Sequence, residues 1–259
     1  GWAWVQFLPL NTNGGFAAGK NAALRVIFRA GNVPPYILLL NPDTVVRQGA
    51  VTALLDFLQA HPRIGLAGSR LEDPDGTPQI SAFNFPSLPS EFEDTLHLGI
   101  VTKMLARFRV PAHQGRVPHR TGWLAGASLL IRREVFEAIG FLDERYFLYY
   151  EETDFCLQAK RAGWPCWYVP ASRVVHLVGQ STGISDLRLV PKRRPAYWFA
   201  SRARYFRKNH GATVALFADL LFVLGTIGWR VRRKFRRQPE PLTPHFLGDF
   251  VKDALKRAC

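Results

Sequence analysis

The chain has 259 residues, 47% of them hydrophobic and 13% aromatic, which is enough for one large domain with a buried core or one domain plus an appendage. Its three cysteines are too few and too scattered for a disulfide framework or a zinc site, and they suit a reducing, cytoplasmic compartment. Almost all of the +14 net charge lies between Arg188 and Arg237, where fourteen Lys or Arg residues accompany one acid. A nearly neutral body with a strongly basic C-terminal segment predicts a polyanionic partner: a membrane surface, nucleic acid or a diphosphate.

The N-terminal region contains a glycine-rich turn. Gly1–Leu8 has neither a basic start nor a long apolar run, so we expect no signal peptide, and the missing initiator Met favours a chain that begins partway into a longer product. The segment from Asn13 to Asn21 then leads into a helix that we expect to continue through Phe28. Glycines ahead of a helix can let backbone N–H groups approach a phosphate, but the spacing is not that of a known phosphate fingerprint. A simple glycine turn is the alternative.

The run Tyr36–Leu40 is continuously apolar and bounded by prolines, which predicts a strand buried on both faces, as in a parallel sheet. It is followed by Asn41-Pro42-Asp43-Thr44, which also fits a type I turn. Ligands of open α/β sheets gather at the carboxyl ends of the strands. Asp43 is therefore a candidate metal ligand as well as a turn former.

Further elements alternate along the body. We expect a helix over 46–60, a strand over 64–68, an irregular segment over 81–120, a strand over 122–131 and a short helix over 133–139 that Gly140 caps. Alternation of strands and helices places the body in the α/β class.

Three carboxylates follow an aromatic stretch. Glu151, Glu152 and Asp154 come directly after Tyr146–Tyr150 and open a predicted helix. Acids are favoured in the first turn of any helix, because orphan N–H groups and the helix dipole stabilise negative charge there. Three of them behind an aromatic wall also suit a site where one acid has a raised pKa and acts as a base. A strand is expected over 167–170, and His176 follows the β-branched pair Val174-Val175 and is either structural or a ligand.

The C-terminal segment, 188–259, differs from the body, 1–187, and we treat it as a separate unit. Aromatic and basic residues alternate over 194–210, an apolar run follows over 214–229, and Arg230–Arg237 is basic. Sixteen residues with an internal Asp219 fall short of the roughly 20 apolar residues that a membrane span needs. The pattern predicts basic amphipathic helices lying in the bilayer interface, with a helix packed on the domain as the alternative.

In their order along the chain, these segments resemble the family 2 glycosyltransferases, which have the GT-A fold that binds nucleotide sugars on a mostly parallel central sheet. The match covers roughly residues 8–185, and its tail is similar to the rhamnosyltransferase branch. The residues that carry it are Asn13-x-Gly15-Phe16 with Asn21, Leu39–Asp43, Gly126–Arg133, Phe136-x-x-x-Gly140-x-x-Asp143-Glu144, Phe147-x-Tyr149-x-Glu151-Glu152-x-Asp154, His176, Arg194–Phe199 and Arg202–His210.

The resemblance implies an inverting transfer in which a base removes a proton from an acceptor hydroxyl and the oxygen displaces a nucleoside diphosphate. It places Glu152 at the base position, one methylene longer than the family's Asp, with Glu151 and Asp154 orienting neighbours or holding the helix start. Asp43 would bind Mg²⁺ or Mn²⁺, His176 could complete that site, and Asn41 replaces the first Asp of the family's Asp-x-Asp motif. The remaining donor-binding positions are Asn13, Gly15, Phe16 and Asn21.

The implied partners are a nucleotide-sugar donor, dTDP-rhamnose if the branch is right, and a lipid-diphosphate-linked or glycan acceptor in cell-wall or surface-polysaccharide synthesis. We expect a peripheral location at the cytoplasmic face of the cell membrane, an anionic membrane surface as partner, and no nucleic acid. The chain starts downstream of the strand and helix with which the family holds the nucleobase. The alternatives are a transferase of galactofuranose or N-acetylglucosamine, a nucleic-acid-binding module, and a non-catalytic module at the membrane surface.

Overall fold

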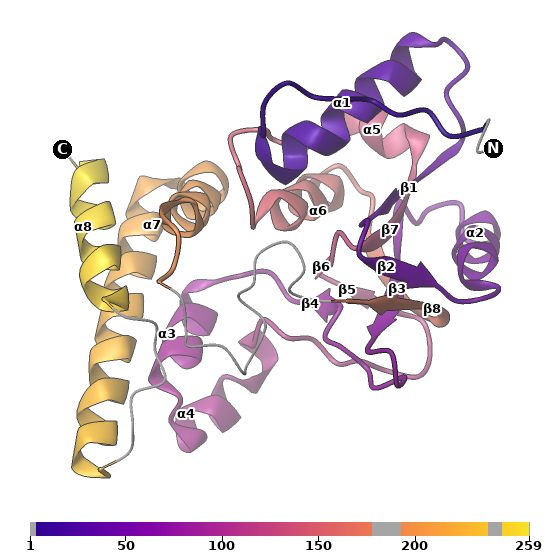
Figure 1. Ribbon diagram of the computed structural model, residues 1–259. Helices are drawn as coiled ribbons and strands as arrows, with labels where there is room; N and C mark the ends of the chain where they lie inside the picture. The colour runs from indigo at the N-terminus through magenta and orange to yellow at the C-terminus, as the bar shows by residue number, and fades with distance from the viewer. Residues whose placement is uncertain (1–3, 178–192, 238–244, 259) are drawn as a thin grey trace.

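The structure, a computed structural model, describes residues 4–177, 193–237 and 245–258. Its centre is a six-stranded sheet in the order β1-β7-β3-β8-β2, with β5 also paired to β8 (Figure 1). The strands are β1 (Tyr36–Leu40), β2 (Thr44–Val46), β3 (Leu66–Glu72), β5 (His119–Thr121), β7 (Ser128–Arg132) and β8 (Cys166–His176). A small second sheet pairs β4 (Ala82–Phe83) with β6 (Trp123–Leu124).

The expectation of a mostly parallel sheet is wrong for the described strands. Only β3 and β8 run parallel there, whereas β1 with β7, β3 with β7, β2 with β8 and β5 with β8 are antiparallel. A continuous apolar run such as Tyr36–Leu40 reports that helices cover both faces of a strand, and it carries no information about the direction of the neighbouring strand. The sheet is therefore mixed.

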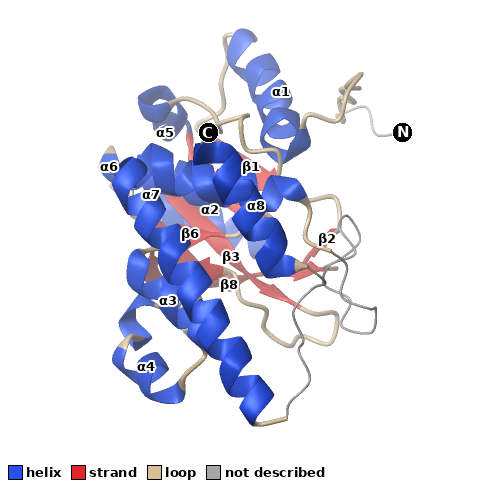
Figure 2. Ribbon diagram, turned by 90° about the vertical axis from the view of Figure 1, so that its left-hand side faces the viewer, coloured by secondary structure: helices blue, strands red, loops and turns tan. Residues whose placement is uncertain are grey.

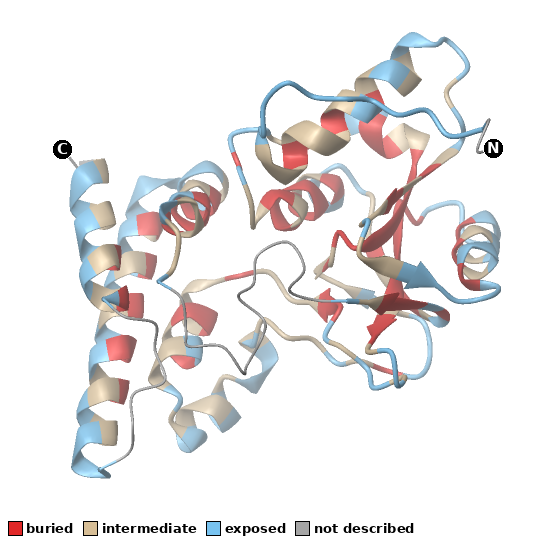
Figure 3. Ribbon diagram, in the orientation of Figure 1, coloured by how far each residue is buried: buried red, intermediate tan, exposed pale blue. Residues whose placement is uncertain are grey.

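Helices cover both faces of this sheet, which confirms the α/β class. On one face, α1 (Gly15–Arg29), α5 (Arg133–Ile139) and α6 (Glu151–Arg161) bury Leu24, Phe136 and Phe155 against β1 and β7. On the other face, α2 (Ala50–Ala60) buries Leu54 and Leu58. In Figure 3 the buried residues lie along the strands of the sheet, on α6 and on one side of α2, and also on the helices of the C-terminal part of the chain. The predicted helix over 46–60 starts late, since Val46 belongs to β2.

The segment 81–120 is not irregular, contrary to the sequence prediction. It contains α3 (Leu88–Leu96), α4 (Gly99–Met104), a 3₁₀ turn (Ala106–Phe108) and the strands β4 and β5. Helix α3 is begun by a reciprocal capping box between Ser87 and Ser90, in which serine replaces the usual Glu or Gln. The helix packs on the C-terminal part of the chain, so its stability depends on contacts more than 100 residues away.

The C-terminal segment folds as α7 (Ala196–Phe235) and α8 (Phe246–Ala258), and Gly211 interrupts α7 with a φ of 86°. Figure 2 shows α7 and α8 in front of the sheet with α3 beside them. The Arg202 guanidinium joins α7 to α3 because it donates to Glu91 at 2.6 and 2.9 Å, both side chains being buried. The predicted boundary between 187 and 188 lies outside the described residues and stays a prediction.

Candidate active site

Helix α1 begins at a position that only glycine fits. Gly15 has a φ of 88°, and the N–H of the next residue, Phe16, donates to the carbonyl of Phe147 at 2.9 Å. A Cβ atom on Gly15 would lie 1.9 Å from that carbonyl oxygen. Asn13 supports the turn, since its side chain accepts from the Gly15 N–H at 3.1 Å. The glycine-rich turn thus brings the start of α1 against the aromatic loop that precedes α6.

The two glutamates follow directly on a strained backbone. Tyr149 and Tyr150 both have left-handed conformations, with φ values of 71° and 68°. Such residues cost roughly 1–2 kcal/mol each and persist only where surrounding contacts enforce them. Tyr150 is enforced by packing on Tyr205 of α7, with ring centroids 5.4 Å apart. The strain fixes where Glu151 and Glu152 enter the helix.

Both glutamates are held in an environment that favours the protonated form. Glu151 is buried, and the Oε2 atoms of Glu151 and Glu152 are buried without a hydrogen-bond partner among the described residues. Burial raises the pKa of Glu152, and burial together with the neighbouring Glu152 charge raises the pKa of Glu151. This is the electrostatic situation of a carboxylate that can hold a proton near neutral pH.

Glu152 meets residues from two other elements. Its Oε1 faces the backbone N–H of Gly126 at 3.4 Å, just ahead of β7. A Cβ on Gly126 would lie 3.0 Å from the Phe16 ring and 3.5 Å from Glu152 Oε1. The missing side chain therefore lets the Phe16 ring, the Gly126 backbone and the Glu152 carboxyl converge. An apolar ring beside a carboxyl excludes water from it, which is one source of the raised pKa.

A second group of polar side chains lies where β1 and β8 end. Thr44 pairs with His176 across β2 and β8, and this register brings His176 Nε2 to 3.6 Å from Asp43 Oδ1. Asn41 Oδ1 and Asp43 Oδ1 are buried and have no hydrogen-bond partner among the described residues. The turn is closed by the Thr44 hydroxyl, which donates to the Asn41 carbonyl at 2.7 Å.

These residues fit a hard divalent cation. Two orphaned oxygens and an imidazole are the donor types that Mg²⁺ and Mn²⁺ accept, and such ions commonly take one or two carboxylates together with substrate phosphates. Burial lowers the pKa of His176 although the Asp43 charge opposes the shift, so the ring stays neutral and able to ligate. No group of three or more His, Cys, Asp or Glu side chains that could hold a metal ion occurs in the described part of the chain.

The backbone links the two groups, since the Asn41 N–H donates to the carbonyl of Ala127, next to Gly126, at 3.0 Å. Lys20 also reaches this edge, because its Nζ donates to the Leu40 carbonyl at 2.7 Å. Burial lowers the pKa of Lys20, and the Asp43 charge opposes the shift. Lys20 was given no role in the sequence analysis, and its place shortly after the glycine turn, early in the helix that follows, was the available signal.

Two predicted site residues are used inside the protein. The Asn21 amide donates to the Leu142 carbonyl at 2.7 Å and to Glu144 at 2.8 Å, and it accepts from the Leu142 N–H at 3.1 Å. Asp154 accepts from Lys208 Nζ at 2.5 Å and from the Asn209 amide at 2.7 Å. Asn21 therefore holds the loop ahead of α6, and Asp154 holds α6 to α7, so neither points toward Glu152.

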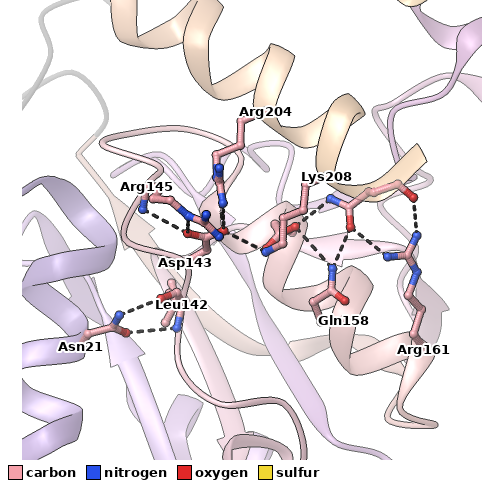
Figure 4. Close-up of polar contacts among 10 residues, drawn as sticks. Asn21, Leu142, Asp143, Arg145, Gln158, Arg161, Arg204 and Lys208 are labelled. Carbon is pink, nitrogen blue, oxygen red and sulfur yellow. Dashed lines mark hydrogen bonds and ion pairs between the residues drawn. The ribbon is translucent and has the colours of Figure 1, made fainter. Parts of the chain in front are cut away.

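The sequence analysis missed the α7 side of this arrangement. Lys208 also donates to Asp143 at 3.0 Å, and Arg204 donates to the same carboxylate at 2.6 Å (Figure 4). Burial by itself would raise the pKa of Asp143, but hydrogen bonds from Arg204, Lys208 and Arg145 hold it well below its usual range. The basic segment is thus partly an internal clamp on the loop and helix that carry the glutamates.

Comparison with known proteins identifies the relatives of this arrangement. The chain is 33% identical over 190 residues to the N-acetylglucosaminyl-diphospho-decaprenol L-rhamnosyltransferase of Mycobacterium tuberculosis, covering 69% of this chain and 61% of that protein. It is 22% identical over 224 residues to the dTDP-rhamnosyl transferase RfbF of Shigella flexneri, covering 85% and 69%. A mannosyltransferase structure from Pyrobaculum calidifontis with GDP-Man and Mn²⁺ matches with 13% identity and a TM-score of 0.45, over 94% of this chain and 66% of that one.

The chain thus spans about three fifths of the mycobacterial relative. A family model described as glycosyltransferase like family 2 matches residues 5–211, which include the glycine turn, the Asn41–Thr44 turn, both glutamates and the clamp on α7. On this match the chain belongs to glycosyltransferase family 2, and its α/β body is the GT-A type of fold that the motifs predict.

Proposed function

We propose that this chain is the catalytic part of an inverting hexosyltransferase that moves L-rhamnose from dTDP-rhamnose to a lipid-diphosphate-linked sugar acceptor. The observation that carries the proposal is the Glu152 carboxyl beside Phe16: its Oε1 accepts from the Gly126 N–H, and its Oε2 is buried without a hydrogen-bond partner among the described residues. The donor and acceptor classes are supported by the names of the mycobacterial and Shigella relatives.

Glu152 acts as the base in this proposal. It takes the proton of an acceptor hydroxyl, and that oxygen forms a bond to the anomeric carbon of the donor sugar. The bond from that carbon to the diphosphate oxygen breaks on the opposite face, so that the configuration inverts and the nucleoside diphosphate leaves. Since burial raises the pKa of Glu152, it is a stronger base than an exposed glutamate and matches the operating pH better.

Glu151 and Asp154 serve as positioning residues. Glu151 adds negative charge beside Glu152, which raises the affinity of the pair for a proton. Asp154 fixes α6 through Lys208, and Asn21 fixes the loop before α6. We assign both of them to the support of the base and not to direct donor contact.

Asp43, Asn41 and His176 would hold the divalent cation, which neutralises charge on the leaving diphosphate when bound. Lys20 adds a positive charge at the same edge. Asn13, Gly15 and Phe16 form the turn beside the donor; Gly15 does so through its close approach to Phe147, and Phe16 through its ring against Gly126. Mg²⁺ and Mn²⁺ both fit the ligand atoms of Asn41, Asp43 and His176, and the titration described next distinguishes the two ions.

Calorimetric titration with dTDP, UDP and GDP, each with Mn²⁺, with Mg²⁺ and without metal, tests the donor half of the proposal. The expected result is metal-dependent binding with dTDP preferred. Preference for UDP would move the donor to a galactofuranosyl or N-acetylglucosaminyl nucleotide. Absence of nucleotide binding under all conditions would contradict a working donor site in this chain.

A further inference from the structure

The second half of α7 exposes a continuous apolar face. The outward residues recur at intervals of three or four, which is the spacing of one side of a helix, and each is 43–59% exposed. They are Leu216, Phe217, Leu220, Leu224, Ile227 and Val231. No polar side chain interrupts them, and at the end of the helix Phe235 is 83% exposed. Soluble surfaces rarely present such a contiguous apolar strip unless it binds something.

The opposite face of the same helix is committed to the protein. Ala218, Phe222, Gly225 and Trp229 are buried, and Gly225 packs so closely that a Cβ there would lie 2.0 Å from Thr95 Oγ1 of α3. By length and composition, α7 is apolar enough to cross a membrane. It is not a core helix, because only 28% of its most apolar window is buried inside the protein. A helix that packs on the protein along one side and is apolar along the other can lie flat on an apolar surface.

Helix α8 extends this surface. Val251 and Leu255 are exposed on it, and between α7 and α8 lies an apolar groove of about 320 Å³. In Figure 1, α7 and α8 form the side of the molecule farthest from α2. The apolar strip therefore belongs to a broad outer face and is not a single ridge.

Basic residues follow the apolar strip at the C-terminal end of α7. Six of the eight residues Arg230–Arg237 are Arg or Lys, and no acid occurs between Leu220 and Arg237. On the side of this end that faces α3, a cavity of about 440 Å³ is lined by His97, Trp229, Arg232, Arg233 and Arg236. Arg232 is anchored there, donating to the Leu96 and His97 carbonyls at 2.7 and 2.8 Å. Lys252 and Lys256 are exposed on α8, whose Asp249 and Asp253 are paired with Arg193 and Arg257.

We propose that the outer face of α7 and α8 docks on an anionic lipid bilayer, with α7 lying in the plane of the interface. Helices of this kind bury their apolar face about 5–10 Å into the headgroup region, and each basic residue near the surface contributes about 1 kcal/mol. The occupant is a lipid surface because the strip is wholly apolar, the chain from Leu220 to Arg237 carries only basic charges, and the acids Asp219, Asp249 and Asp253 beside it are paired with arginines. Nucleic acid would use the charge and leave the strip exposed, and a second copy would bring like charge against these basic residues.

The docking surface is joined to the active site through one helix. Before Gly211, α7 carries Lys208 and Asn209, which hold Asp154 of α6. Docking would therefore fix the orientation of Glu152 toward the membrane from which a lipid-linked acceptor comes. This deepens the proposed function and rests on it only for the nature of the acceptor.

The test is co-sedimentation of the chain with two kinds of vesicle. One contains phosphatidylcholine alone, and the other also contains about 30% phosphatidylglycerol, which makes its surface anionic. We expect binding to the anionic vesicles that weakens with salt. Leu220→Glu/Leu224→Glu should reduce the apparent affinity about tenfold or more. The matched control, Val26→Glu/Val51→Glu, places the same charges at exposed valines of α1 and α2 and should bind as the wild type does.

Lys234→Gln/Arg236→Gln should weaken binding to anionic vesicles and reduce its salt dependence. Circular dichroism melts check folding, and nucleotide titration, which does not involve this face, should be unchanged in every variant. Absence of vesicle binding, or equal binding by both glutamate pairs, would overturn the proposal. Two other results would overturn it. One is a chain that does not bind vesicles but forms a dimer, which Leu220→Glu/Leu224→Glu dissociates. The other is salt-sensitive binding to DNA that only Lys234→Gln/Arg236→Gln abolishes. Loss of nucleotide binding with retained docking would instead contradict the proposed function.

Discussion

Lys208 Nζ lies 2.5 Å from Asp154 Oδ2, which joins α7 to the helix that begins with the two glutamates. The Asp154 side chain is almost fully buried and the Lys208 side chain is about two thirds buried. The segment that composition alone marks as a polyanion-binding tail thus also stabilises the candidate active site. Its basic residues have two uses: Arg204 and Lys208, before Gly211, clamp the site, whereas those after Val231 form the basic end of α7.

Lys208→Ala is expected to lower the free energy of unfolding by about 1–3 kcal/mol, because it leaves the buried Asp154 carboxylate short of its charged partner. Urea unfolding measures this, and Lys208→Arg should restore most of the loss. Arg145→Ala, which removes a largely exposed partner of Asp143, should cost less than about 1 kcal/mol. Equal losses for Lys208→Ala and Arg145→Ala would contradict the clamp.

Gly15→Ala is expected to destabilise the chain by at least about 1–3 kcal/mol and to abolish transfer, since the positive φ and the Phe147 carbonyl leave no room for a methyl group. Gly19→Ala is the matched control four residues on, in the interior of α1, where a Cβ meets nothing within 4 Å. It should raise stability by about 0.5–1 kcal/mol. Thermal melts of both variants measure these changes in stability. A Gly15→Ala variant as stable as the wild type would contradict the close contact with the Phe147 carbonyl.

The raised pKa of Glu151 makes a signed prediction. In the unfolded chain this carboxyl ionises near its ordinary value, whereas in the folded chain it ionises only at higher pH. The folded state therefore holds more protons between the two values, and stability falls as pH rises through that window. Glu151→Gln should raise the melting temperature at pH 8 and leave it nearly unchanged at pH 4. A stabilisation that is the same at both pH values would argue against a buried ionised pair.

Asp43→Ala should weaken Mn²⁺-dependent nucleotide binding about tenfold or more, because it removes the only carboxylate proposed for the cation. His176→Ala should weaken this binding less, because it removes a neutral ligand and not a charged one. Asp56→Ala removes an exposed acid from α2 and should bind nucleotide as the wild type does. Unchanged metal-dependent affinity in Asp43→Ala would leave this residue as a turn former.

Local patterns predicted the parts of the fold that depend on local physics. The strand at Tyr36–Leu40, the helix at Arg133–Ile139 with its Gly140 cap, and the helix that starts at Glu151 all have signals within a few residues. Helix α3 has a local start signal in its Ser87–Ser90 capping box, but its burial has none, because Ser90, Glu91 and Glu93 are expected to be exposed until the packing of α7, with Arg202 on Glu91, is known. The direction of the strands could not be predicted for a similar reason, because an apolar run does not indicate whether the neighbouring strand is parallel or antiparallel.

The same division applies to the candidate site. The order of the motifs predicts Asp43, Glu152 and His176 as site residues, and these assignments stay predictions; it gave Asp154 the role of orienting neighbours or holding the helix start. It did not show that Asp154 and Asn21 turn toward Lys208 and Leu142, because those contacts join residues 54 and 121 positions apart. Tertiary hydrogen bonds of this span leave no trace in local spacing.

The central claim is that Glu152 is the base, and turnover of Glu152→Gln tests it most directly. The assay follows rhamnose transfer from dTDP-rhamnose to an N-acetylglucosaminyl-diphospho-prenol acceptor in anionic vesicles, with dTDP affinity measured on the same protein. The account predicts a loss of about 10²–10⁴-fold in kcat, the usual contribution of general base catalysis, with nucleotide affinity nearly unchanged. Turnover like that of the wild type would remove Glu152 from the chemistry and contradict the account.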